Sequence, residues 1–129
     1  MNARFTERES CVLPPSKDAP AAARRFVAAA LGSRGITNAF ADLPLLTSEL
    51  VTNAVRHAES EVAVSLAFAP DRVRLEVADR SSRLPVVTHG AAVRSRGWGL
   101  HIVEQLATRW GLEPGDCGKT VWCEVSGSP

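Results

Sequence analysis

The sequence predicts an α+β fold, a two-layer sandwich with helices on one face of a mixed, mostly antiparallel sheet. Two observations lead to this fold class. Segments with apolar residues three and four positions apart, typical of helices, occur beside segments in which apolar and polar residues alternate, typical of strands. The two kinds of segment do not alternate strictly along the chain, which disfavours a doubly wound parallel sheet. The expected order is strand, helix, helix, strand, strand, loop, helix, strand, strand.

The chain is expected to begin with a strand over residues 5–13, which ends at two consecutive prolines. A helix then runs through APAAARRFVAAAL to about residue 31. Asp18 is its expected N-cap, and Pro20 lies in its first turn, where proline is tolerated. Gly32 and Gly35 are expected to end it.

A second helix is expected through LLTSELVTNAVRHA, with Asp42 as cap and Pro44 in the first turn. Its apolar residues recur at spacings of three and four, which places them on one buried stripe. The stripe consists of Leu43, Leu46, Leu50, Ala54 and Ala58.

Two strands should follow as an antiparallel hairpin. In EVAVSLAF and RVRLEVAD every second residue is apolar, and Pro70 and Asp71 form a short turn between the two segments. In the second segment, Val73, Leu75 and Val77 share one face and charged residues occupy the other.

The remainder begins with a predicted loop over residues 80–96 and a third helix that starts near Gly97 or Gly99 and ends by Gly111. A short strand over 110–113, a turn over 115–118 and a closing strand TVWCEV complete the chain. The residues that the third helix should bury are Leu100, Val103, Leu106 and Ala107.

The length of 129 residues fits one domain over residues 1–129. The composition, with 45% hydrophobic and 22% charged residues, is that of a globular domain. A net charge of +1 disfavours binding to nucleic acid through a strongly basic face. No apolar run is long enough to cross a bilayer, and the N-terminus lacks the apolar region of a secretory signal. We therefore expect a cytoplasmic protein without direct membrane contact.

Three cysteines, Cys11, Cys117 and Cys123, are an odd number, which fits reduced thiols in a cytoplasm. No CxxC pair occurs, so a zinc site is disfavoured. We interpret Cys123 as a core residue of the closing strand.

The second helix carries the first candidate chemistry. Glu49, Asn53 and His57 follow one another at intervals of four, so they lie along one line of the helix beside the apolar stripe. There the Asn53 carbonyl oxygen could ligate a hard cation such as Mg²⁺, and Glu49 could accept a proton from a nucleophile. The alternative is an ordinary solvated flank of the helix.

A carboxylate ends the predicted hairpin. Asp79 has the parity of Val77, so on a buried face it would point inward and could accept a hydrogen bond from an exocyclic amine of a ligand. The alternative is that Asp79 simply begins a turn.

Two glycines open the third helix. In Arg96-Gly97-Trp98-Gly99-Leu100 the glycines would let the backbone approach a ligand, and N–H groups at the helix start would face an anion. Arg96 could contact the same phosphate. The spacing is neither that of a P-loop nor that of a dinucleotide-binding fingerprint.

The order of these features resembles the Bergerat-fold ATP-binding domain that gyrase, histidine kinases and mismatch-repair ATPases share. Within that superfamily the chain is most similar to the small stand-alone bacterial anti-sigma-factor serine kinases, over about residues 45–125. The resemblance implies ATP and Mg²⁺ as cofactors, with Glu49 as the catalytic base and Asn53 as the Mg²⁺ ligand. It assigns the adenine amine to Asp79.

The same resemblance places Gly97, Gly99 and Leu100 near the phosphates, and implies that Thr120 holds the adenine through a water. Thr120, however, has the parity of Trp122, opposite to that of Val121 and Cys123. We therefore have no account from the sequence of how its side chain would reach the base.

Function and partners also follow from the resemblance. It implies a protein serine kinase that acts on an anti-sigma antagonist and sequesters a sigma factor, with a homodimer by analogy. A non-catalytic nucleotide-sensing module is the alternative: residues 79–85, DRSSRLP, lack the glycines of the family's DxGxG, and the lid that follows has about eleven residues. A nucleic-acid-binding regulator is disfavoured by the charge.

Overall fold

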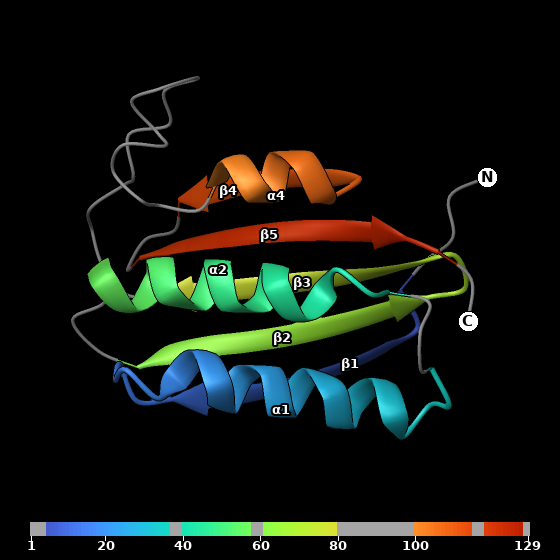
Figure 1. Cartoon of the computed structure of the whole chain (residues 1–129), viewed down its shortest axis with the longest axis horizontal. Coiled ribbons are helices and arrows are strands. Elements are labelled where there is room, and N and C mark those ends of the chain that lie inside the picture. Colours follow the sequence, from blue (N-terminus) through green and yellow to red (C-terminus); the bar gives the residue numbers. More distant parts are fainter. Residues whose placement is uncertain (1–4, 37–39, 58–60, 80–99, 115–117, 128–129) are drawn as a thin grey trace.

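The computed structural model describes residues 5–36, 40–57, 61–79, 100–114 and 118–127, which form five strands and three helices in the predicted order. Figure 1 shows them as two layers. The elements are β1 (Glu7–Leu13), α1 (Ala19–Gly32), α2 (Leu43–His57), β2 (Val62–Ala69), β3 (Arg72–Asp79), α4 (Leu100–Leu106), β4 (Arg109–Pro114) and β5 (Lys119–Ser126).

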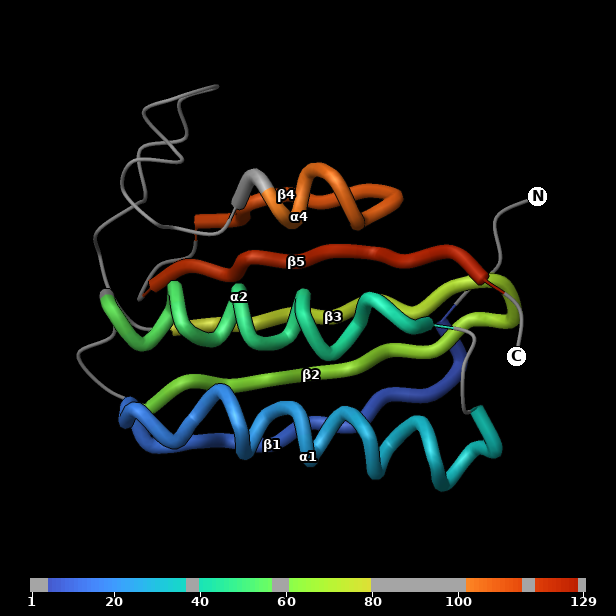
Figure 2. The backbone as a smooth tube through the Cα atoms, viewed as in Figure 1, coloured from blue at the N-terminus to red at the C-terminus, as the bar shows by residue number. Residues whose placement is uncertain are grey.

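The strands form one sheet in the order β1-β2-β3-β5-β4, and every neighbouring pair among the described strands is antiparallel. The predicted hairpin of β2 and β3 is present, with Val64 opposite Val77. β5 lies between β3 and β4, as Figure 2 shows. The α+β fold class is therefore confirmed.

The three helices cover one face of this sheet (Figure 1). α1 packs on β1 and β2, α2 on β2 and β3, and α4 on β4 and α2. The predicted stripe of α2 is the centre of the core, since Leu43, Leu46, Leu50 and Ala54 are all buried. Ala58 lies outside the described residues. None of the described helices is long and apolar enough to span a membrane.

The start of α1 differs from the prediction in one respect. Asp18 occupies the N-cap position, but its backbone is helical, with φ −87° and ψ −9°, and its side chain makes no capping hydrogen bond. The capping mechanism predicted for Asp18 is therefore wrong, because an N-cap side chain reaches the first-turn amides from a non-helical backbone. After α1, Gly35 has φ +69°, a left-handed conformation that favours glycine.

The later elements follow the predicted pattern closely. α4 ends at Leu106, and Val103 is its buried residue. Leu106 and Ala107 are partly buried against the core. The side chain of Leu100 is not among those that the structure describes. The predicted loop over 80–96 and most of the turn over 115–118 are also outside it.

The opposite face of the sheet carries a ladder of charged side chains. Arg74 is central to it: its guanidinium contacts Glu76 at 2.7 Å and Glu124 at 3.0 Å, and it lies 4.0 Å from the Trp122 ring centre. Arg8 extends the ladder to β1 through Glu76. These contacts join β1, β3 and β5 across this face.

Candidate functional site

Glu49 and Asn53 lie one turn apart in α2, as the sequence predicts. Their positions border the buried stripe, and α2 packs against both β3 and α4. Asn53 is only 2% exposed, whereas Glu49 is half-buried. The interpretation of this line as a solvated flank is therefore wrong for Asn53.

The Asn53 side chain has an unusual environment. Its Oδ1 atom is buried and has no hydrogen-bond partner among the described residues. Leaving a buried acceptor unpaired costs about 1–3 kcal/mol, so such an atom calls for an explanation. An amide oxygen is a ligand that Mg²⁺ accepts, so this residue fits the cation that the sequence suggested.

Asp79 is the last residue of β3 and points to the helix side of the sheet, as predicted from its parity. Its carboxylate is not alone there. The Lys119 ammonium lies 3.2 Å from Oδ1 and 3.1 Å from Oδ2, and the two side chains are 2% and 1% exposed. A buried ion pair thus stands where the sequence predicted a single carboxylate.

Sequence reasoning missed Lys119. In the register of β3 and β5, Asp79 lies opposite Lys119, whereas Thr120 lies opposite Ala78. Because successive strand residues face opposite sides, the Thr120 side chain is on the far face from Asp79. Lys119 alternates in phase with Val121 and Cys123, so the sequence does place it on their face of the strand. To predict its contact with Asp79 one must also know that β5 pairs with β3.

Several predicted site elements meet at one side of the molecule. Figure 1 shows the end of β3, the start of β5, the C-terminal end of α2 and the start of α4 together on the left. Leu100 is the first residue of α4. Arg96, Gly97 and Gly99 lie outside the described residues, as does the side chain of His57, the last residue of α2.

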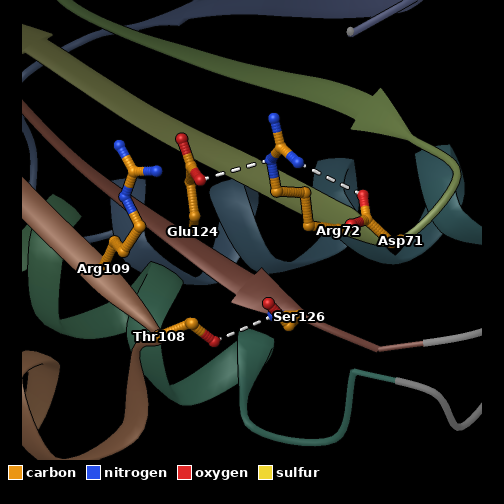
Figure 3. Close-up of a pocket in the computed structure, with 6 residues that line it drawn as sticks. All are labelled: Asp71, Arg72, Thr108, Arg109, Glu124 and Ser126. Carbon is orange, nitrogen blue, oxygen red and sulfur yellow. Dashed lines mark hydrogen bonds and ion pairs between the residues drawn. The ribbon is translucent and has the colours of Figure 1, made fainter. Parts of the chain in front are cut away.

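A pocket of about 330 Å³ lies elsewhere on the sheet (Figure 3). It is lined by Asp71, Arg72, Thr108, Arg109, Glu124 and Ser126. Arg72 and Ser126 are opposite each other in the register, seven positions along β3 from Asp79, or roughly 23 Å at the usual rise. This pocket is therefore separate from the predicted site.

The charges of this pocket largely compensate one another. Arg72 contacts Asp71 and Glu124, each at 3.3 Å, and the Ser126 amide donates to Thr108 Oγ1 at 3.0 Å. Figure 3 shows these contacts. The pocket lining therefore does not favour either an anionic or a cationic ligand.

The cysteine interpretation is confirmed for Cys123, which is fully buried in β5. Burial raises the pKa of its thiol to about 12, although the nearby Arg74 charge lowers it. Among the described residues no group of three or more His, Cys, Asp or Glu side chains could hold a metal ion. Cys117 lies outside them.

Comparison with known protein families gives one match. Residues 13–124 match the family model described as the histidine kinase-like ATPase domain. The match covers nearly the whole chain and includes Glu49, Asn53, Asp79 and Lys119. None of the curated proteins compared with the chain matches it.

Proposed function

The chain belongs to the histidine kinase-like ATPase family, and from this premise we propose that it is a protein serine kinase that uses Mg-ATP. The family implies ATP binding and a regulatory role. The finer assignment rests on the resemblance to stand-alone anti-sigma-factor kinases and on the residues of α2.

The single observation that carries the proposal is the Asn53 amide. Its oxygen is buried, accepts no hydrogen bond from any residue that the structure describes, and lies in the helix that also presents Glu49. We propose that Asn53 holds Mg²⁺, which when bound would neutralise charge on the nucleotide's phosphate oxygens. Asp79 would accept a hydrogen bond from the adenine amine. Arg96, Gly97, Gly99 and Leu100 would contact the phosphates.

Glu49 is the proposed base. It is half-buried, one turn from Asn53, and it would take the proton from a serine hydroxyl of a partner protein. The serine oxygen would form the new bond to the γ-phosphorus while the bond to the ADP oxygen breaks. The products are phosphoserine, ADP and a protonated Glu49.

The proposed partners are an anti-sigma antagonist, which is phosphorylated, and a sigma factor, which is sequestered. A phosphoserine adds about −1.5 to −2 charges, enough to release a protein from an interface. The proposal includes a cytoplasmic location and a homodimer. The alternative function, a nucleotide sensor without catalysis, is favoured by the lack of glycine in residues 79–85.

The test is a phosphotransfer assay with γ-labelled Mg-ATP and antagonist-type proteins that carry a serine. We expect the wild-type chain to transfer phosphate and Glu49→Gln to lose at least a hundredfold in rate, since a positioned base contributes about 10²–10⁴. Glu113→Gln is the matched control, because Glu113 is an exposed residue of β4.

Calorimetry separates the two functions. ATP binding without phosphate transfer to any partner would favour the nucleotide sensor. If Glu113→Gln loses phosphate transfer as fully as Glu49→Gln does, the assay assigns no specific role to Glu49. Asn53→Ala should lose the Mg²⁺-dependent part of the nucleotide affinity. We expect Asn53→Ala to bind the nucleotide with the same affinity with and without Mg²⁺. If Mg²⁺ raises the nucleotide affinity of this variant as much as it raises that of the wild type, Asn53 is not the Mg²⁺ ligand.

A further inference from the structure

We propose that the pocket of Figure 3 binds a small zwitterion, a molecule that carries one ammonium and one carboxylate group, as an amino acid does. The pocket lies at the end of β3 away from Asp79. The residues that line it take no part in the proposed kinase mechanism. The inference therefore goes beyond the proposed function, and its test needs no nucleotide.

The charged side chains of the pocket follow one another with alternating sign. Figure 3 shows them in the order Arg109, Glu124, Arg72 and Asp71. The inner two are held by the protein, since Glu124 lies 3.3 Å from Arg72 and 3.0 Å from Arg74. The outer two, positive at Arg109 and negative at Asp71, therefore stand at opposite ends of the pocket.

The outer charges are the ones that the protein engages least. Arg109 forms no ion pair with any residue that the structure describes, and its guanidinium lies 5.9 Å from the Trp122 ring centre. The Asp71 side chain is 66% exposed, and its contact with Arg72, at 3.3 Å, is a surface ion pair of the kind that contributes little. Both outer groups thus keep capacity to bind a charged group of a ligand.

The wall between the two ends adds a hydrogen-bond acceptor. Glu124 Oε1 is buried and accepts no hydrogen bond from the described residues, although Arg72 Nε lies 3.3 Å away. A donor on a ligand would remove the cost of leaving this acceptor unfilled. The other lining residues, Thr108 and Ser126, bear hydroxyl groups.

These features together select a dipolar ligand. A ligand with one charge would be attracted at one end of the pocket and repelled at the other, whereas a zwitterion in the right orientation is attracted at both. The volume of about 330 Å³ is at the lower end of the range for small-molecule sites, which suits a ligand of amino-acid size. Because none of the described lining residues is apolar, the ligand should carry no large apolar side chain.

The test is a titration of the full chain, followed by NMR, with glycine and with 4-aminobutyrate, two zwitterions that differ in the separation of their charges. Acetate and methylammonium are the single-charge fragments of glycine, and butyrate and butylammonium are those of 4-aminobutyrate. We expect at least one zwitterion to bind about tenfold or more tightly than either of its fragments, because a second charge-assisted contact is added. Binding no tighter than that of the fragments, or no saturable binding of either zwitterion, would overturn the inference.

A variant assigns the carboxylate end to Arg109. Arg109→Gln removes the charge at an exposed position, and we expect it to weaken the preferred zwitterion by about tenfold or more while leaving its ammonium fragment unaffected. Arg25→Gln, at an exposed position of α1, is the matched control. Unchanged zwitterion binding by Arg109→Gln, or an equal loss in both variants, would also overturn the inference.

The opposite end is tested by Asp71→Asn, a change at an exposed residue of the turn between β2 and β3. We expect it to weaken the zwitterion and to leave the carboxylate fragment unaffected, and it decides the question should Arg109→Gln fail to fold. An unchanged affinity for the zwitterion in this variant would contradict the placement of the ammonium. Failure of the chain to bind Mg-ATP would remove the proposed kinase and leave this pocket untouched, so the two proposals fail separately.

Discussion

At the scale of single residues, the buried Asn53 amide oxygen carries a cost in folding free energy, because leaving a buried acceptor unpaired is unfavourable. Within the part of the chain that the structure describes, this buried oxygen accepts no hydrogen bond. Natural proteins retain few such atoms, and a bound ion is one of the recognised explanations for those that persist. Stability and binding should therefore respond in opposite ways to a substitution at this position.

We predict that Asn53→Leu leaves the free energy of unfolding within about 1 kcal/mol of the wild type or raises it, because an apolar group of similar size needs no partner. The same variant should lose the Mg²⁺-dependent part of its nucleotide affinity. Urea denaturation and calorimetry with and without Mg²⁺ measure the two effects. A loss of 3 kcal/mol or more, roughly the cost of an unpaired buried group, would instead indicate that the amide supports the fold.

The buried thiol of Cys123 should make the free energy of unfolding fall as the pH becomes alkaline. Burial raises the pKa of its thiol to about 12, whereas an unfolded cysteine ionises near its ordinary value of 9.0. A raised native pKa stabilises the protein below the unfolded pKa, and this contribution is lost as pH rises through the window between the two values. The thiol should also resist iodoacetamide in the native protein at pH 8, since the thiolate is the reactive form.

The measurement is the free energy of unfolding between pH 8 and pH 11, compared with that of Cys123→Ala. We expect the wild type to lose up to about 1.4 kcal/mol per pH unit more steeply than the variant. Parallel curves for the two proteins would contradict the assignment to Cys123.

At the scale of elements, the pairing of β4 with β5 depends on a close approach at Gly111. Gly111 lies opposite Trp122, and a Cβ added to the glycine would come within 2.8 Å of three indole atoms. Trp122 is itself covered by Arg74 at 4.0 Å from its ring centre. The indole therefore cannot yield without disturbing the charged ladder of β3.

We predict that Gly111→Ala lowers the free energy of unfolding by about 1–3 kcal/mol through overpacking. Gly32→Ala is the control, because a Cβ at the end of α1 meets nothing within 4 Å. It should be neutral or slightly stabilising. Thermal denaturation of both variants checks the difference, and equal melting temperatures would show that Trp122 relaxes freely.

The elements themselves were predictable from local patterns. The stripe of α2 and the alternation in β2 and β3 depend only on residues close in sequence, and each was found as predicted. The Asp79–Lys119 ion pair joins residues 40 positions apart and depends on β5 lying beside β3. No periodicity within either strand contains that information, so the partner of Asp79 required the structure.

At the scale of the whole molecule, a ligand bound only by the native state must raise the melting temperature. We predict that Mg-ATP at a hundred times its dissociation constant stabilises the protein by about 2.7 kcal/mol. For a chain of this length the shift should be roughly 10 °C. Differential scanning fluorimetry with Mg-ATP, and with Mg²⁺ alone as control, measures it. No shift at saturating nucleotide would contradict ATP binding.

The place of β5 in the sheet has a consequence for how the chain acquires its fold. β2 and β3 join through a tight turn and can pair early, whereas β5 must close a loop of 39 residues between Asp79 and Lys119 before it reaches β3. β4 hydrogen-bonds only to β5 in the described sheet, and because these strands are close in sequence they can pair as a second hairpin before that closure occurs. We therefore expect the two local hairpins to form first, and the pairing of β3 with β5, which brings Asp79 to Lys119, to be completed last.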